Sequence, residues 1–308
     1  MSNAQGPWVH RVSMVTLAAT LLLVFGLGGA VTSAEVGMAY PTWPDINGWS
    51  IFNFFYGRIA GEFGVGASLE HSHRQSGALI GLLSILLVVL CAAGRNVPSV
   101  WKKLAWANLA LVVVQGLIGA FRVLENNDEL GGVVHAVLAH GVVVLMVGLA
   151  KISSPGWGET VPPGSDAQHR RLVWWTRAGM VVLFLNLVAA ATLRHKVGNF
   201  PAHLVFGLAA AGVWAGCGVL AFGLARKGSR LAKSGHSVLA AVTVQVLLGI
   251  GVWLLILGPG KEWMASPEER FLLEGTLATS HLLIGALVTA TATALAIEAA
   301  WGTRKVAA

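Results

Sequence analysis

The sequence predicts an all-α membrane protein with eight transmembrane helices. Only 11% of its 308 residues are charged and 55% are hydrophobic, whereas soluble domains carry about 25% charged residues. Eight apolar runs approach or exceed the roughly 20 residues that a bilayer-crossing helix needs. The 38 glycines fall largely within these runs, as is common where membrane helices pack closely. Composition therefore argues against a soluble globular domain and against a disordered chain.

The first run is expected to be a membrane span and not a cleaved signal peptide, because it is too long and no small-x-small site precedes a soluble domain. The segment 34–69 behind it is the longest loop. It contains Gly37-Met38-Ala39-Tyr40-Pro41-Thr42-Trp43-Pro44 and further aromatic residues, which favour a position at the membrane interface. The eight spans are expected at about 13–33, 71–94, 102–122, 132–151, 172–193, 202–225, 236–258 and 272–299.

The few charges indicate the orientation. With the N-terminus inside, 14 of the 21 Lys and Arg residues and 3 of the 14 acidic residues lie inside, a net charge of +11, against −4 outside. Basic residues are retained on the cytoplasmic side, so both termini are predicted to be cytoplasmic. The inner residues are Arg11, Arg95, Lys102, Lys103, Lys151, Arg170, Arg171, Arg177, Arg226, Lys227, Arg230, Lys233, Arg304 and Lys305, with Glu159, Asp166 and Glu298.

A polar, Pro- and Gly-rich segment at 152–171 predicts a linker between two halves, 1–155 and 156–308. An internal repeat supports two pseudo-symmetric four-helix bundles. The repeated features occur in the same order in both halves. They are a His, a Gly four residues later, a basic helix end and a Gln-x-x-x-Gly motif: His73, Gly77, Arg95 and Gln115–Gly119 in the first half, and His203, Gly207, Arg226 and Gln245–Gly249 in the second.

Four histidines carry the predicted chemistry. Each lies near the start of an even-numbered span, so the four side chains are expected at the same side of the membrane on parallel helices. Ionisable groups inside spans are costly and mark function, and a His pair on facing helices suits a haem iron better than zinc. A small residue four positions after each His leaves room for a flat macrocycle. The expected pairs are His73 with His135 and His203 with His281, followed by Gly77, Ala139, Gly207 and Gly285.

The two halves differ in one informative respect. Glu70 and Arg74 flank His73, whereas the corresponding Pro201-Ala202-His203-Leu204 has neither an acid nor an arginine. A carboxylate near an iron can move protons or stabilise a cationic intermediate, and Arg can bind a haem propionate. The alternative is that both residues are interfacial anchors. The asymmetry favours a reacting site in the first half and an electron-transfer haem in the second.

The remaining histidines are weaker candidates. His71 faces away from His73, and His140 is expected to pack or form a hydrogen bond. His195 lies in a short outer turn. The cytoplasmic residues His10, His169 and His236 are expected to be solvated.

The sequence resembles the haem A synthase family. The resemblance rests on Glu70-His71-Ser72-His73-Arg74, the Pro-x-Trp-Pro of the first loop, the Gln-containing repeats and one His on each even span, and it covers essentially all eight spans. It implies a multi-pass protein of the cell (inner) membrane that oxidises a ring methyl of haem O to a formyl group. The product is haem A for a terminal oxidase.

The resemblance also implies the roles of individual residues. His203 and His281 would hold a haem b cofactor, His73 and His135 would receive the haem O substrate iron, and Glu70 matches the essential acid of the family. Implied partners are haem O synthase (a farnesyltransferase), a terminal oxidase subunit and membrane lipid, with no nucleic acid. The Gly-rich helix faces permit a homo-oligomer.

The chain departs from the family pattern in its first loop. Many family members carry a Cys pair there, but this chain has Tyr40 at the position before Pro-x-Trp-Pro and no Cys in the loop. The short segment 194–201 also lacks Cys. Thr32 and Ser33 stand where the family often has an Arg. A mechanism that uses an outer disulfide is therefore excluded for this chain.

Two other functions fit parts of the pattern. A di-haem cytochrome b-like electron carrier would also use two His pairs, but it would not explain why Glu70 and Arg74 occur in one half only. A transporter or haem-handling protein would need broken helices and paired charges at mid-membrane. The predicted spans lack such interruptions apart from Gly.

Overall fold

The computed structural model describes residues 6–94, 96–125, 129–157, 166–225, 229–258, 260 and 266–304. Within these residues the regular structure is helical apart from an isolated bridge between Ile46 and Trp49, and eight helical segments are long and apolar enough to cross a membrane. This confirms the predicted number of spans. Five charges used in the orientation argument, Arg95, Arg226, Lys227, Lys305 and Glu159, lie outside the described residues, as does 158–165 of the predicted linker.

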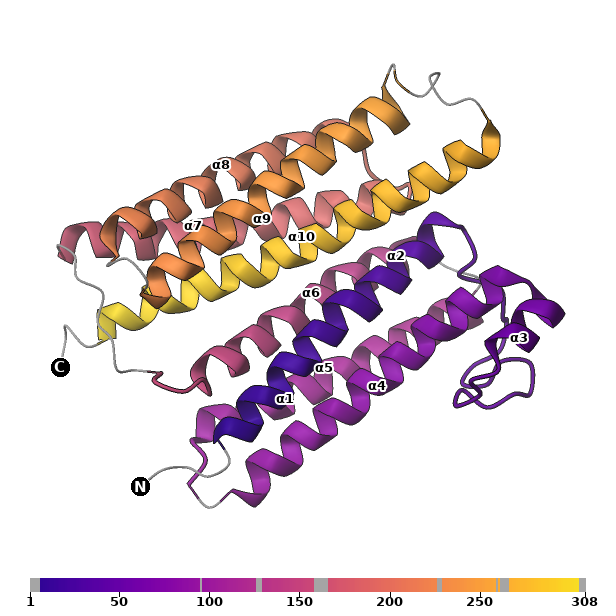
Figure 1. Cartoon of the computed structure of the whole chain (residues 1–308), viewed down its shortest axis with the longest axis horizontal. Helices are drawn as coiled ribbons and strands as arrows, with labels where there is room; N and C mark the ends of the chain where they lie inside the picture. Colours follow the sequence, from indigo (N-terminus) through magenta and orange to yellow (C-terminus); the bar gives the residue numbers. More distant parts are fainter. Residues whose placement is uncertain are drawn as a thin grey trace.

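The first four spans pack against one another (Figure 1). The first span is α1 (Gly6–Ala19), which continues through the π-helix η1 (Thr20–Phe25) into α2 (Gly26–Ser33). A short helix, α3 (Tyr56–Phe63), lies within the first loop, the segment 34–69 of the sequence analysis. The other three spans are α4 (Val65–Ala93), α5 (Ser99–Leu124) and α6 (Glu129–Ile152).

The last four spans form the second group of packed helices. They are α7 (Asp166–Arg194), α8 (Phe200–Leu224), α9 (Arg230–Val252) with the π-helix η2 (Trp253–Leu257), and α10 (Pro267–Arg304). Figure 1 shows both termini at one end of the molecule, here called the terminal end, and α3 at the opposite end, here called the loop end.

Several helices extend beyond the apolar runs that predict them. The second span begins at Val65, six residues before the expected 71, so Glu70 and Arg74 lie well inside α4. Hydropathy marks only the apolar part of a helix, whereas backbone hydrogen bonding continues through polar turns at its ends. The observed bounds therefore place the polar residues on rigid helix and not in a loop.

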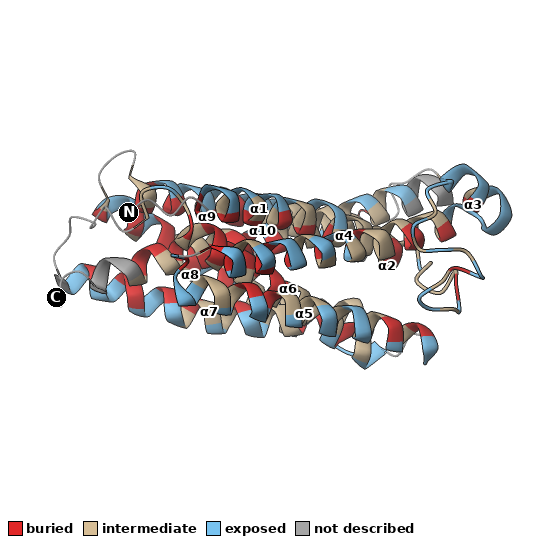
Figure 2. Cartoon of the chain, turned by 90° about the horizontal axis from the view of Figure 1, so that it is seen from below, coloured by how far each residue is buried: buried red, intermediate tan, exposed pale blue. Residues whose placement is uncertain are grey.

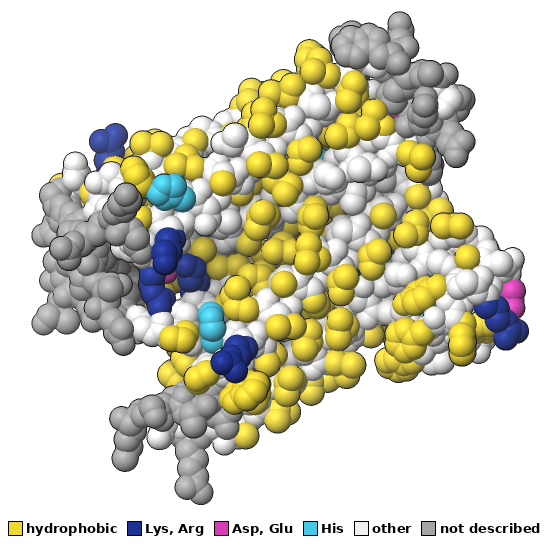
Figure 3. All heavy atoms as spheres, viewed as in Figure 1, with side chains coloured by type: hydrophobic (Ala, Val, Ile, Leu, Met, Phe, Trp, Pro, Cys, Tyr) yellow, Lys and Arg dark blue, Asp and Glu magenta, His cyan; other side chains and the backbone are white. Residues whose placement is uncertain are grey.

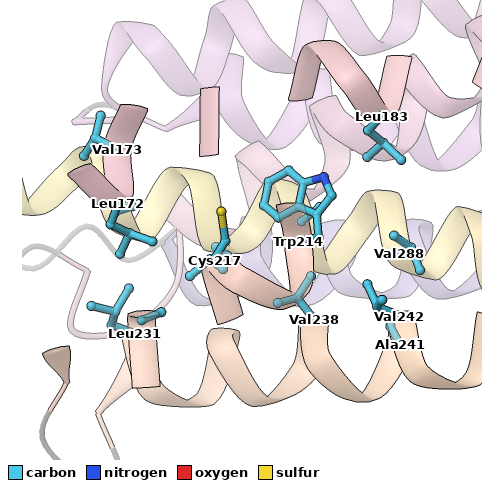
Figure 4. Close-up of a cluster of buried hydrophobic side chains, with 14 of the residues drawn as sticks. Leu172, Val173, Leu183, Trp214, Cys217, Leu231, Val238, Ala241, Val242 and Val288 are labelled. Carbon is cyan, nitrogen blue, oxygen red and sulfur yellow. The ribbon is translucent and has the colours of Figure 1, made fainter. Parts of the chain in front are cut away.

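Residues between the helices are buried (Figure 2) and mostly apolar, and apolar side chains also cover much of the outside (Figure 3). In the second group of helices Trp214 is fully buried among Leu172, Leu183 and Val238 (Figure 4). Its indole N–H donates to the carbonyl of Gly179 at 3.2 Å. The apolar exterior is far larger than the patches that soluble proteins expose, as expected where lipid replaces water. Both cysteines, Cys91 and Cys217, are buried as predicted.

The two groups of helices meet along α10, which packs against α6 and α2. At the terminal end Lys151 of α6 forms an ion pair with Glu298 of α10 at 3.0 Å and also donates to Ser234. The side chains are only 25% and 9% exposed. A pair this well buried depends on both partners, because each charge would otherwise lack a counter-ion.

The prediction for His169 is wrong. The sequence analysis expected this cytoplasmic histidine to be solvated, but it is buried and forms a 2.9 Å hydrogen bond with the carbonyl of Ala299. The cause is the contact between α7 and α10, which hydropathy along a single segment does not reveal.

Removing one partner of the Lys151–Glu298 pair should destabilise the protein. We expect Glu298→Ala to cost about 2 kcal/mol, because the Lys151 ammonium loses its counter-ion in a mostly buried position. The apparent midpoint of thermal unfolding in detergent measures this. The double variant Lys151→Met/Glu298→Leu should recover most of the loss.

The exposed pair Arg58–Glu62, whose side chains are 67% and 40% exposed, provides the control. Glu62→Ala should cost no more than about 0.5 kcal/mol. Equal effects of Glu298→Ala and Glu62→Ala would show that the inter-helix pair does not hold the two groups together.

Candidate functional site

Two of the four predicted histidines face each other in the second group of helices. His203 of α8 and His281 of α10 have ring centroids 6.2 Å apart and an interplanar angle of 85°. An imidazole nitrogen binds a metal at about 2 Å, so two rings on opposite sides of one haem iron have centroids about 6 Å apart. The separation of this pair fits a haem iron between the rings.

The surroundings of His281 come from the repeated Gln-x-x-x-Gly motif on α9. A Cβ built on Gly249 would lie 3.1 Å from Cε1 of His281, so the ring packs directly on the glycine. The amide nitrogen of Gln245 is 3.1 Å from Nε2 of His281. The Nδ1 atoms of His203 and His281 are buried and have no hydrogen-bond partner among the described residues. Both rings therefore retain a nitrogen that a metal could use.

The first group of helices contains the corresponding arrangement. A Cβ on Gly119 of α5 would lie 3.5 Å from Cε1 of His135, and the side chain of Gln115 donates to the carbonyl of His135 at 3.0 Å. His73 packs even more closely on Gly28 of α2, where a Cβ would lie 2.7 Å from its Cε1. The Nδ1 atoms of His73 and His135 are buried and have no hydrogen-bond partner among the described residues, as in the second pair.

The sequence analysis assigned room for a flat macrocycle to the small residue four positions after each His. A Cβ on Gly77 would meet nothing within 4 Å, so open space lies beside this glycine. The glycines on which the imidazoles themselves pack are different residues. The space next to three of the histidines comes from glycines on neighbouring helices: Gly28, Gly119 and Gly249. The Gln-x-x-x-Gly repeat contained this signal for two of them.

Glu70 and Arg74 hold the first loop against α4. Glu70 is buried, pairs with Arg74 at 2.5 Å and accepts the backbone N–H of Tyr40 at 3.2 Å. The Arg74 guanidinium donates to the carbonyls of Thr42 at 2.7 Å and of Asp45 and Tyr40, each at 3.1 Å. All these contacts are with each other or with the loop. The predicted roles of the two residues toward an iron and a propionate stay predictions.

The next turn of α4 binds the following part of the loop. His71 is buried and contacts the carbonyl of Asn53 through Nε2 at 2.6 Å. Gln75 donates to the carbonyls of Ile51 and Asn53 at 2.9 and 2.8 Å. The aromatic residues of this loop segment point outward: Phe52, Phe54 and Phe55 are 61%, 66% and 72% exposed.

Tyr40, the residue just before the Pro-x-Trp-Pro segment of the first loop, is fully buried. Its ring lies 5.8 Å from the Arg74 guanidinium and packs edge-on against Phe63 at 5.6 Å. Burial, and to a lesser extent the Glu70 carboxylate, raises the pKa of the Tyr40 hydroxyl. A buried aromatic ring and an ion pair thus hold this loop.

Three consecutive basic residues at the end of α7 and in the turn that follows it are functional candidates that sequence reasoning missed. Arg194 donates to the carbonyl of Gly29 at 2.9 Å and to Ser33 at 2.8 Å. His195 packs on Gly132 of α6, where a Cβ would lie 2.5 Å from its Nδ1. Lys196 pairs with Glu35 at 2.8 Å. The second group of helices therefore reaches over the loop end of the first.

The electrostatics of this turn are unusual. Burial, helped by the nearby charges of Arg122 and Arg194, lowers the pKa of His195 to about 4, so the ring is neutral at physiological pH. The exposed Lys196–Glu35 pair lowers the pKa of the carboxyl and raises that of the ammonium. Arg122 lies near the end of α5, and the sequence analysis gave it no role.

His140 behaves as predicted for a packing residue. Its Nδ1 is 3.0 Å from the carbonyl of Ala136, and its ring packs edge-on against Phe25 at 4.9 Å. In the described part of the chain no group of three or more His, Cys, Asp or Glu could hold a metal ion. The available donor sets are His pairs, which suit an iron whose other ligands are porphyrin nitrogens.

Comparison with known proteins finds relatives named haem A synthase. The protein of Symbiobacterium thermophilum is 34% identical over 128 residues, which cover 41% of this chain and 39% of the relative. That of Caulobacter vibrioides is 31% identical over 131 residues, 40% of this chain and 36% of the relative. That of Methylorubrum populi is 28% identical over 171 residues, or 52% and 44%. The matches thus span about four-tenths of the relatives' length.

No solved structure gives a significant match to this chain. The family model of the cytochrome oxidase assembly proteins, COX15-CtaA, matches residues 10–199, which is more than half of the 308 residues. The matched region includes the Glu70–Arg74 segment, both histidines of the first pair and the turn at His195. Together with its eight apolar helices, this match shows that the chain is an integral membrane protein and belongs to the COX15-CtaA family of cytochrome oxidase assembly proteins.

Proposed function

We propose that this protein is a haem A synthase-like oxidoreductase, which converts haem O to haem A by successive hydroxylation of a ring methyl to a formyl group. The product would serve the assembly of a terminal oxidase. The observation that carries the proposal is the occurrence of two His pairs, only one of which has a buried carboxylate, Glu70, three residues away on the same helix. The names of the relatives support the same reaction.

The second half, residues 156–308, is proposed to hold haem b between His203 and His281. The 6.2 Å separation of the ring centroids and the two partnerless Nδ1 atoms support this assignment. When bound, the haem supplies one-electron transfer to the other site. The protein has to keep the two imidazole rings on opposite sides of the iron. The contact between Gly249 and His281 helps to hold the His281 ring in that position.

The first half, residues 1–155, is proposed to receive haem O, with His73 and His135 as ligands of the substrate iron. Glu70 lies one helical turn from His73, close enough for a carboxylate to hold or move a proton next to the reacting edge. Arg74 compensates its charge and keeps it oriented. The same ion pair keeps the first loop over this end of the site.

The proposed orientation has both termini in the cytoplasm and both His pairs in the outer half of the cell (inner) membrane. The distribution of charge supports it, because Lys and Arg side chains gather at the terminal end in Figure 3. Matching Gln–Gly–His contacts in the two groups of helices support pseudo-symmetric halves. Haem O synthase and a terminal oxidase subunit are the proposed partners.

Pigment extraction tests the proposed function most directly. The purified protein, supplied with haem O, should contain haem b together with haem A or a hydroxylated haem O. Chromatography and mass spectrometry of acid–acetone extracts identify these pigments. Haem b alone, with added haem O unchanged, would contradict the enzyme and favour a di-haem electron carrier.

Replacing Glu70 by a neutral side chain should impair haem A formation without affecting the binding of haem b. We expect Glu70→Gln to lower haem A formation by about 100-fold while the haem b spectrum stays intact, because the amide oxygen can still accept the N–H of Tyr40. The control Glu62→Gln, in an exposed pair at the same end, should be normal. His203→Ala should lose the haem b spectrum. Normal product formation by Glu70→Gln would remove Glu70 from the mechanism.

Adding a methyl group to the glycines should disturb the two His pairs separately. Gly249→Ala is expected to displace His281 and shift the haem b absorbance bands, because its Cβ would lie 3.1 Å from the ring. Gly28→Ala should displace His73, leave haem b unchanged and weaken haem O binding. Gly116→Ala, whose Cβ meets nothing within 4 Å, is the matched control. Identical spectra and haem O titrations in all variants would contradict this seating of the rings.

A further inference from the structure

Helical spacing defines a layer of residues next to the first His pair, on the side of the loop end. On α5, Arg122 follows Gly119 by three residues, and on α6, Gly132 precedes His135 by three residues. Helix α5 ends and helix α6 begins at the loop end. Arg122 and Gly132 therefore lie one turn, about 5 Å, beyond the contact between Gly119 and His135, toward the loop end. This layer therefore forms the rim of the first site.

The second group of helices completes the rim. The His195 imidazole lies on Gly132, with 2.5, 2.6 and 3.0 Å between a built Cβ and its Nδ1, Cε1 and Cγ. Arg194 fixes the turn through its bonds to Gly29 and Ser33, and Lys196 fixes it through Glu35. A residue from the second half is thus held in place at the site of the first half.

The rim carries positive charge. Arg122 and Arg194 both act electrostatically on His195, the imidazole that lies on Gly132. The acidic residue that acts on His195 is Glu129, which is exposed at the start of α6. Cations near the edge of an apolar site are stabilised by an anionic ligand, and the planar guanidinium of arginine favours carboxylate or phosphate groups.

We propose that Arg122 and His195 bind the carboxylate edge of the tetrapyrrole substrate. This inference rests on the proposed function and adds the orientation of the substrate to it. Both haem carboxylates lie on one edge of the ring, farther from the iron than one helical turn. The long side chain of Arg122, which starts one turn beyond the contact between Gly119 and His135, can extend toward that edge. Binding that edge at the rim determines which ring methyl is presented to Glu70.

The rim also distinguishes the two sites. Aligning Gln115–Gly119 with Gln245–Gly249 places Val252 at the position of Arg122. The second site therefore lacks a cation at this place on its Gln-x-x-x-Gly helix. Arg122 is expected to contribute to substrate selection at the first site without affecting haem b.

The test compares two forms of one ligand. Protein that contains haem b, in phosphatidylcholine nanodiscs, is titrated with ferric haem O and with its dimethyl ester, and binding is followed by absorbance. The wild type should bind the free acid more tightly than the ester. Arg122→Gln should weaken free-acid binding by about 10- to 100-fold and leave ester binding unchanged. Arg122→Lys should recover part of the loss.

Two further variants probe the rim. Gly132→Ala should push His195 away and weaken free-acid binding several-fold, with little effect on the ester. Arg58→Gln removes an exposed arginine at the same end and should change neither titration. An unchanged haem b spectrum verifies that each variant is folded.

Several results would overturn the proposal. These are equal affinities of the wild type for acid and ester, or an equal loss of both in Arg122→Gln. An effect of Arg122→Gln seen only with phosphatidylglycerol present would assign the rim to a lipid phosphate instead. If the wild type binds neither form of haem O, the proposed function itself fails, whereas binding of both without discrimination refutes only the carboxylate rim.

Discussion

The arrangement of this molecule depends on imidazole rings packed directly onto glycines of neighbouring helices. His73 lies on Gly28, His135 on Gly119 and His281 on Gly249. Within a membrane, helices approach closely only where a small residue faces the partner, and a buried imidazole needs a defined position because water cannot solvate it. The glycines meet both requirements at once. They set the distance between helices and leave ring nitrogens available, as opposed His ligands require.

The first loop depends on a different interaction, the buried pair of Glu70 and Arg74. Many family members carry a Cys pair in this loop, whereas here the Arg74 guanidinium binds three backbone carbonyls and Glu70 binds the N–H of Tyr40. The order of the loop thus depends on electrostatics and on the packing of Tyr40, and it is independent of redox state. In the proposed enzyme the same carboxylate serves the chemistry, so loop position and reactivity are coupled through one residue.

Side-chain contacts join the two groups of helices at both the terminal end and the loop end. Lys151 and Glu298 join them at the terminal end, and Arg194, His195 and Lys196 join them at the loop end. The second group therefore supplies part of the surroundings of the first His pair. For a protein proposed to pass electrons from one half to the other, such contacts keep the two sites at a constant separation.

The sequence by itself determined the eight spans, the four histidines on parallel helices and the difference between the halves at Glu70 and Arg74. These features follow from hydropathy and from the period of a helix, which are local properties of the chain. Only the tertiary structure decided that Gly28 seats His73, that His169 is buried against Ala299, and that Arg122 and His195 share a rim. Each of these joins different helices, and Arg122 and His195 are 73 positions apart. Such a contact depends on how helices pack, and no local pattern records it.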